Sequence, residues 1–159
     1  MKDILSEIQG RILFITLNRT DKNNAFDDRL LESLSSILDS ANHNSEIRVI
    51  VLKANGQHFS AGADINWMQR MAHFTEEENL ADAKKLAYVM HQLHHSPKPT
   101  IAMVQGAAYG GGAGLVAACD IGIAANNARF CFSEVKLGLI PAVISPYIVH
   151  AIGPRAARW

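Results

Sequence analysis

The sequence has no excess of charge of either sign. Its 159 residues include 15 Lys and Arg and 15 Asp and Glu, so the formal net charge at pH 7 is zero. Proteins that hold nucleic acid or anionic membranes through charge carry a basic excess. The composition therefore predicts no nucleic acid and no membrane surface among the partners of this chain.

Long hydrophobic runs are also missing. No stretch approaches the ~20 apolar residues that span a bilayer, and Met1-Lys2-Asp3 does not open an apolar signal region. There are only two cysteines, Cys119 and Cys131, and we interpret both as reduced core residues. These features predict a cytoplasmic protein. With 48% hydrophobic and 19% charged residues, the chain is long enough for one sizeable core.

Strand-like and helix-like patterns alternate along the chain. Leu30, Leu34 and Leu38 recur at helical spacing, and Thr75 precedes three acids as an N-cap would. Expected strands cover 4–8, 11–18, 47–53, 100–104 and 120–125, and expected helices cover 27–41 and 76–95. Strand followed by helix predicts an α/β fold with a largely parallel sheet, in one domain over residues 1–159.

A glycine-rich segment, 104–114, lies between an expected strand at 100–104 and an expected helix at 115–119. Glycines at such a junction let the backbone approach a ligand closely, and the first amides of a helix attract negative charge. The charge could belong to a phosphate or to an oxyanion that forms during a reaction.

These glycines allow two other interpretations. Gly112, Gly114 and Ala117 fit G-x-G-x-x-A, the dinucleotide fingerprint, with Glu134 at about the expected distance downstream. The context disfavours it, because 105–111 separates the strand end from the first glycine of that motif. The third interpretation is close helix packing without a ligand.

A second loop of small residues, 58–65, follows the expected strand at 47–53. Asp64 is placed to cap a short helix through Trp67 and Met68, which we expect to lie in the core. The order of strand, small-residue loop and helix thus occurs twice. We expect one backbone amide from each loop to converge on a single oxygen.

These motifs, taken together, resemble the crotonase (enoyl-CoA hydratase/isomerase) superfamily. The resemblance rests on spaced matches at 17–19, 24–26, 59–65, 97–102, 106, 110–112, 118–121, 128–130, 134 and 137–141. It implies a spiral of ββα turns, here the N-terminal core only, and an acyl-CoA thioester as substrate. It places the thioester oxygen between the amides of Ala63 and Gly111, with coenzyme A as part of the substrate and no other cofactor.

The resemblance also implies the acid/base chemistry. Hydratases of the family commonly use two glutamates; Glu134 matches the second, and Gly114 stands at the position of the first. An apolar neighbourhood would disfavour the charged form of a lone carboxylate, which suits a general acid/base. The tract 133–147 resembles hydratases of methylglutaconyl-CoA and related branched, carboxylated thioesters. A Δ3,Δ2-enoyl-CoA isomerase, or an inactive acyl-CoA-binding or oligomerisation fragment, is the alternative.

Further residues are expected to bind the substrate or its coenzyme A portion. They are Lys22, Asn24, Ala25, Phe26, Ala61, Asp64, Ile65 and Gly110. The segment from Ile144 onward begins what resembles a helical region. Relatives continue substantially further with C-terminal helices, so we expect this chain to be truncated before that C-terminal helical region. If that C-terminal part is supplied, the resemblance implies a homo-oligomer, either a trimer or a dimer of trimers.

Histidines at positions 91 and 95 have the i, i+4 spacing of metal ligands. No acid follows His91 in the arrangement of zinc proteases, and Pro97 marks the end of the expected helix. We therefore interpret them as an exposed helix end and predict no metal.

Overall fold

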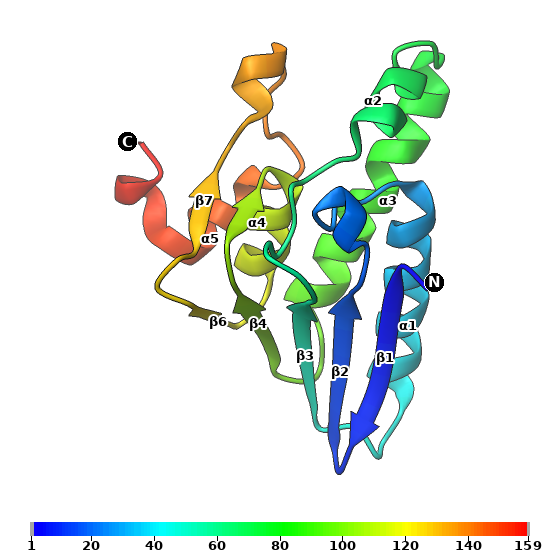
Figure 1. The fold of residues 1–159 in the computed structure, drawn as a ribbon, viewed down its shortest axis with the longest axis vertical. Coiled ribbons are helices and arrows are strands. Elements are labelled where there is room, and N and C mark those ends of the chain that lie inside the picture. Colours follow the sequence, from blue (N-terminus) through cyan, green and yellow to red (C-terminus); the bar gives the residue numbers. More distant parts are fainter. Residues whose placement is uncertain (1, 159) are drawn as a thin grey trace.

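The computed structural model describes residues 2–158. Its base is a five-stranded sheet in the order β1-β2-β3-β4-β6 (Figure 1). β1 and β2 form an antiparallel hairpin, and every later strand is added parallel, as the alternating pattern predicted. The strands are β1 (Ile4–Gln9), β2 (Ile12–Leu17), β3 (Val49–Ala54), β4 (Thr100–Val104) and β6 (Ile121–Ala124).

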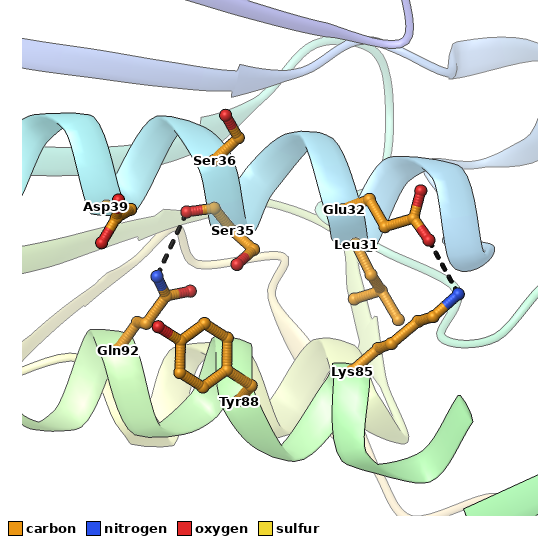
Figure 2. Close-up of a pocket in the computed structure, with 8 residues that line it drawn as sticks. All are labelled: Leu31, Glu32, Ser35, Ser36, Asp39, Lys85, Tyr88 and Gln92. Carbon is orange, nitrogen blue, oxygen red and sulfur yellow. Dashed lines mark hydrogen bonds and ion pairs between the residues drawn. The ribbon is translucent and has the colours of Figure 1, made fainter. Parts of the chain in front are cut away.

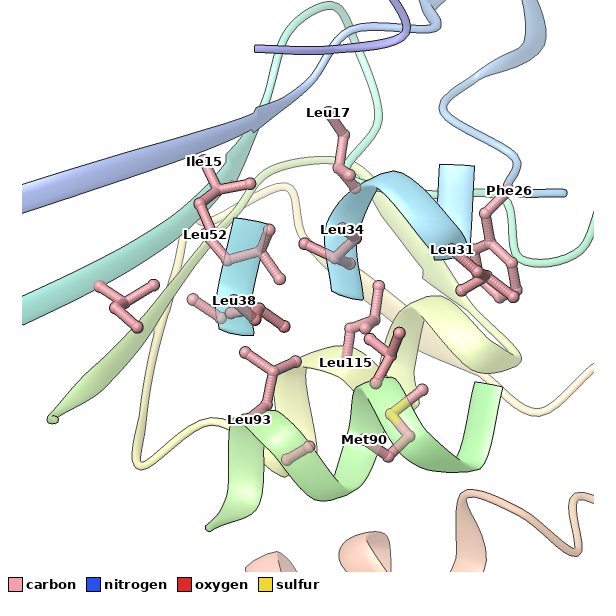
Figure 3. Close-up of a cluster of buried hydrophobic side chains, with 14 of the residues drawn as sticks. Ile15, Leu17, Phe26, Leu31, Leu34, Leu38, Leu52, Met90, Leu93 and Leu115 are labelled. Carbon is pink, nitrogen blue, oxygen red and sulfur yellow. The ribbon is translucent and has the colours of Figure 1, made fainter. Parts of the chain in front are cut away.

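Three helices build the core together with this sheet: α1 (Asp28–His43), α3 (Glu76–His94) and α4 (Gly111–Ala118). Asp27 caps α1 by accepting from the Leu30 amide, and Thr75 with Glu78 forms a capping box on α3. Side chains of all three helices meet strand residues in one buried cluster (Figure 3), which includes Ile15, Leu52, Leu34, Leu38, Met90, Leu93 and Leu115.

Shorter elements complete the chain. They are α2 (Ile65–Met71), α5 (Ser145–Ala156) and the 3₁₀ turns η1 (Thr20–Lys22) and η2 (Glu134–Leu137). α5 lies in the helical region expected from Ile144 onward, but its backbone leaves the helical range at Gly153, where φ is 81° just before Pro154. None of the helices described between residues 2 and 158 is long and apolar enough to cross a membrane.

A second, two-stranded sheet was not predicted. β5 (Ala107–Tyr109) pairs in parallel with β7 (Arg129–Cys131). Each strand has three residues, too few to show an alternating pattern. The expected start of α4 at Leu115 was also wrong, because the helix begins four residues earlier, at Gly111. Residues 107–114 of the glycine-rich segment therefore form a strand, a one-residue turn and the first turn of a helix.

Both cysteines are free, but neither is fully buried. The expectation that they are core residues was therefore only partly right. Cys119 packs against the edge of the core, and burial of its thiol raises the pKa of Cys119 to about 12. The thiolate, the reactive form, is accordingly scarce at neutral pH.

Four histidines gather where the end of α3 meets α5. The ring centroids of His94 and His150 are 4.9 Å apart, those of His94 and His95 are 5.0 Å apart, and His91 stacks on His95 at 4.1 Å. The Tyr147 ring lies 5.2 Å from His94. Across residues 2–158, no group of three or more His, Cys, Asp or Glu side chains is placed to hold a metal ion.

We expect this cluster to make folding sensitive to acid. Burial, reinforced by His150 and His95 and opposed by Asp120, lowers the pKa of His94. The folded state therefore holds His94 neutral, and stability falls as the pH drops below the unfolded value of about 6.5. The melting temperature should decline between pH 7.5 and 5.5, and His94→Gln should flatten that decline. His43→Gln, at a side chain that is 81% exposed, is the control. An equal slope in wild type and His94→Gln would contradict the prediction.

Candidate active site

The loop of small residues at 60–64 is held between two distant parts of the chain. Isolated bridges pair Ser60 with Ala108 and Phe26 with Ala63. The Tyr109 amide donates to the Ser60 carbonyl at 2.9 Å, and the Phe26 amide donates to the Gly62 carbonyl at 2.9 Å. The loop is therefore fixed by its own backbone beside β5, the strand that leads into the glycine-rich turn.

The two loops touch at Gly62 and Gly110. Gly62 has φ 90°, and a Cβ atom on it would lie 2.9 Å from the Tyr109 carbonyl oxygen. Gly110, at φ 50° and ψ −123°, makes the single-residue turn between β5 and α4, and its amide donates to the Cys131 carbonyl at 2.8 Å. These positive φ angles favour glycine over any residue with a side chain.

Ala63 and Gly111 follow these two glycines directly. Within residues 2–158, neither amide has a hydrogen-bond acceptor. For Gly111 the reason is general, because the first residue of a helix has no carbonyl four residues earlier in the helix to receive its N–H. Two unpaired donors thus border the same contact between loops.

Glu134 approaches this contact from η2. A Cβ atom built on Gly110 would lie 3.0 Å from the Oε1 atom of Glu134, so the carboxylate stands against the turn that opens α4. Its Oε2 atom is buried and has no hydrogen-bond partner among the residues that the structure describes. Glu134 is thus not a solvated surface acid or a helix cap, the roles in which most glutamates are found.

One cavity of about 560 Å³ unites these groups. Its wall includes the predicted site residues Phe26, Ala61, Ala63, Ile65, Gly110, Gly111 and Glu134. Most of the remaining wall is apolar and comes from α2, α3 and the segment 137–144. Trp67 and Met68 belong to it, and Trp67 is also a buried core residue, as expected. Asp82 and Lys136 are its further charged side chains among residues 2–158.

Four predicted binding residues lie outside the wall of this cavity: Lys22, Asn24, Ala25 and Asp64. Asn24 is buried, and its side-chain amide donates to the carbonyls of Asn55 and His58, each at 2.8 Å. Its Oδ1 accepts from the Arg19 amide at 2.8 Å. The side chain is therefore fully engaged in joining loops, and the expected contact between Asn24 and the substrate stays a prediction.

Asp64 is likewise engaged inside the protein. It caps α2 by accepting from the Asn66 amide at 2.8 Å, as predicted, and pairs with Lys22 at 2.9 Å and Arg19 at 3.0 Å. Burial alone would raise its pKa, but Lys22, the amides of Asn66 and Trp67, and Arg19 together lower the pKa of Asp64. Its carboxylate is thus a permanent anion that orders the loop, and Lys22 is partly neutralised by it.

The rest of the glycine-rich segment serves packing. A Cβ atom on Gly112 would lie 2.9 Å from the Ser60 Cβ, and one on Gly114 would lie 2.4 Å from Cγ2 of Ile144. Close helix packing, one of the three interpretations of the sequence, therefore explains Gly112 and Gly114. Of the glycines in segment 104–114, Gly110 and Gly111 line the cavity.

Because Ile144 crowds Gly114, a glutamate at position 114 would strain the core before it could act as a second acid. Because Ile144 is buried and its methyl group occupies the space, we expect Gly114→Glu to destabilise the protein by at least about 3 kcal/mol. Adding Ile144→Ala should recover part of that stability, measured as the midpoint of urea unfolding. A single variant with the wild-type midpoint would contradict this.

Sequence reasoning missed Asp82. The available signal was an acid on the same helical stripe as Leu86, Val89 and Leu93, where apolar residues alone were expected.

A second, smaller cavity of about 360 Å³ lies elsewhere, between α1 and α3, and is lined mainly by polar side chains (Figure 2). It contains none of the predicted site residues.

Comparison with known proteins decides the family. The family model "Enoyl-CoA hydratase/isomerase" matches residues 7–159. The chain belongs to the enoyl-CoA hydratase/isomerase family. A crystal structure from Legionella pneumophila, described as an enoyl CoA hydratase/isomerase (crotonase), superimposes with a TM-score of 0.96 at 66% identity. It covers 98% of this chain and 60% of its own.

Other members of the enoyl-CoA hydratase/isomerase family agree. An enoyl-CoA hydratase from Shewanella pealeana has a TM-score of 0.96 at 50% identity, over 99% of this chain and 59% of its own. The 2,3-dehydroadipyl-CoA hydratase of Escherichia coli is 36% identical over 158 residues, covering 99% of this chain and 60% of its own. This chain therefore has the crotonase fold and spans about 60% of the length of such relatives.

Proposed function

We propose that this chain carries the catalytic core of an enoyl-CoA hydratase, a hydro-lyase that adds water across the double bond of an α,β-unsaturated acyl-CoA thioester. The observation that carries the proposal is the meeting of three groups on one largely apolar cavity: the unpaired amides of Ala63 and Gly111 and the carboxylate of Glu134, whose Oε2 atom is buried. The family membership supports the same chemistry.

The proposed mechanism divides the work between backbone and side chain. Glu134 takes a proton from water while the water oxygen bonds to Cβ of the thioester, and the electron pair of the double bond moves onto the thioester oxygen. The amides of Ala63 and Gly111 stabilise that oxyanion, because fixed donors gain most where charge develops. Protonated Glu134 then returns a proton to Cα, which restores the carbonyl. Coenzyme A is part of the substrate, and no other cofactor enters the proposal.

A branched thioester that carries its own carboxylate, of the methylglutaconyl type, is the favoured substrate. Lys136 supports this choice, because it is a cation on the wall of an otherwise largely apolar cavity. Lys136→Met should lower kcat/KM for 3-methylglutaconyl-CoA about tenfold and leave crotonyl-CoA nearly unchanged. Equal effects on both thioesters would remove the substrate carboxylate from the proposal.

A Δ3,Δ2-enoyl-CoA isomerase is the second candidate. The observation in its favour is that Ile144 fills the space beside Gly114, so within the described part of the chain no second acid stands with Glu134 at α4. One carboxylate suffices to move a proton between Cα and Cγ. Ultraviolet absorbance separates the candidates, because hydration of an enoyl thioester lowers it and isomerisation of a 3-enoyl thioester raises it. A chain that binds the thioester and changes neither signal would be an inactive binding fragment.

A homo-oligomer, a trimer or a dimer of trimers once the C-terminal part of the fold is supplied, is the final part of the proposal. Large apolar side chains in and just after η2 are solvent-exposed, among them Val135 at 75%, Leu137 at 60% and Ile140 at 80%. We infer that further protein covers these side chains, because burial of exposed apolar surface drives association. Sedimentation equilibrium of this chain extended by the C-terminal part of a relative should give a mass about three or six times that of the extended monomer. A monomer at micromolar concentration would contradict this part alone.

A further inference from the structure

The helix α2 needs an anchor outside itself. It has seven residues, and isolated helices below ~12–15 residues are marginal in water. It follows directly on Ala63 and Asp64, and its residues Ile65 and Trp67 line the cavity. Whatever holds α2 in place therefore also positions one wall of the cavity and the loop that carries the Ala63 amide.

Two side-chain bonds join α2 to other elements within residues 2–158. Arg70 pairs with Asp28 of α1 at 3.2 Å, on the surface, where such pairs contribute little. The indole N–H of Trp67 donates to Oδ2 of Asp82 in α3 at 2.8 Å. Trp67 is 5% exposed and Asp82 is 6% exposed, so this second bond is shielded from water. A buried hydrogen bond to a carboxylate is the stronger of the two kinds.

The indole ring in turn contacts the catalytic region. Trp67 meets the Phe26 ring edge to face, with centroids 6.3 Å apart and planes at 62°. Cζ of Phe26 lies 2.4 Å from the position of a Cβ atom on Gly111, so this ring covers the first residue of α4. The backbone of Phe26 also bonds to Gly62 and Asp64 on either side of Ala63. Phe26 thus touches the surroundings of both proposed oxyanion donors.

We propose that Asp82 is a positioning residue for this site. By holding the Trp67 indole, it fixes α2 against α3 and, through the Phe26 ring, keeps the amides of Ala63 and Gly111 in register for the thioester oxygen. The effect on catalysis rests on the proposed function, whereas the anchoring of α2 does not. Displacement of reacting groups by about 1 Å can cost on the order of 100-fold in rate.

The test compares substitutions that keep or remove the acceptor. Asp82→Asn retains a carbonyl oxygen for the indole N–H, and Asp82→Leu does not. We expect Asp82→Leu to lower kcat for crotonyl-CoA by about 10- to 100-fold with a smaller change in KM, and Asp82→Asn to stay within about threefold of wild type. Trp67→Phe should lower kcat by about the same factor as Asp82→Leu. The double variant Trp67→Phe/Asp82→Leu should lower kcat no further than either single variant.

A second measurement needs no turnover. Hydrogen exchange of the α2 amides should accelerate at least about tenfold in Asp82→Leu and stay near wild type in Asp82→Asn. In a Trp159→Phe background Trp67 is the one remaining tryptophan, and its emission should shift to the red in Asp82→Leu. Glu32→Gln is the matched control, because Glu32 bonds to Lys85 at 2.7 Å (Figure 2), and Lys85 also lies 3.7 Å from Asp82.

The outcomes separate the two proposals. Unchanged α2 exchange in Asp82→Leu, or equal losses of rate in the Leu and Asn variants, would overturn the role of Asp82. Additive losses in the double variant would do the same. If wild type turns over no thioester while α2 exchange responds as expected, the proposed function fails and the anchoring by Asp82 stands.

Discussion

Glu134→Gln is expected to reduce turnover of an enoyl-CoA substrate by about 10³-fold or more while the protein still binds the thioester. Among residues 2–158, this carboxylate is the side chain placed to move protons at the turn that opens α4, where Oε1 stands beside Gly110 and Oε2 is buried with no hydrogen-bond partner in that range. The amide of glutamine has nearly the same shape but cannot accept and return a proton. Binding depends on the loop amides and the apolar wall, which the substitution leaves in place.

Two measurements on the same samples test this prediction, one of turnover and one of binding. Single-turnover absorbance with crotonyl-CoA reports proton transfer, and equilibrium binding of the thioester reports the cavity. Glu77→Gln, an acid in the first turn of α3 and outside the cavity wall, is the control and should retain full activity. Wild-type turnover in Glu134→Gln would remove this residue from the mechanism. Loss of binding and turnover together would indicate a structural role instead.

The elements that the sequence predicted well are those whose signals are local. The helical spacing of Leu30, Leu34 and Leu38 and the Thr75 capping box lie within one element each, and α1 and α3 were found within a few residues of their ends. Such patterns depend on which face of an element is buried, and that face can be read without knowing the neighbour.

The start of α4 was misplaced because glycine disfavours helix in isolation. The structure nevertheless places Gly111, Gly112 and Gly114 inside the helix, each where a side chain would collide with another part of the protein. Tertiary packing here overrides local preference, and the partners lie far away in the sequence. β5 escaped prediction for a related reason, because its pairing with Arg129–Cys131 is non-local.

The candidate site was only partly accessible to sequence reasoning. The resemblance predicted roles for Glu134, Ala63 and Gly111, which the structure places on one cavity. The two loops meet there partly through the bridge between Ser60 and Ala108. No local pattern encodes that bridge. The inward orientation of Asn24 could not be predicted either, since a polar side chain near a loop can face a ligand or join backbone segments. For Asp64 the capping of α2 was predicted, whereas its ion pair with the distant Arg19 was not.

The second large effect is expected from Gly111→Ala. The added methyl group would lie 2.4 Å from Cζ of Phe26 and 3.2 Å from its Cε1, and the ring is buried against Trp67. Either the ring or the first residue of α4 must move. Since the Gly111 amide is one of two proposed oxyanion donors, its displacement should cost about 10²- to 10³-fold in kcat, as removal of one such donor does elsewhere.

Two further variants decide whether displacement of the amide is the cause. Gly122→Ala, in β6, adds the same methyl group where it would meet Val116 at an ordinary 3.5 Å, and it should retain activity. Phe26→Leu removes the colliding ring atoms, so Gly111→Ala combined with Phe26→Leu should turn over faster than Gly111→Ala alone. If Phe26→Leu restores part of the kcat that Gly111→Ala removes, the loss of kcat comes from the collision between the methyl group and the Phe26 ring. If instead Gly111→Ala keeps the wild-type kcat, the amide at this position does not stabilise the oxyanion, and the proton transfer by Glu134 must proceed with Ala63 as the one backbone donor.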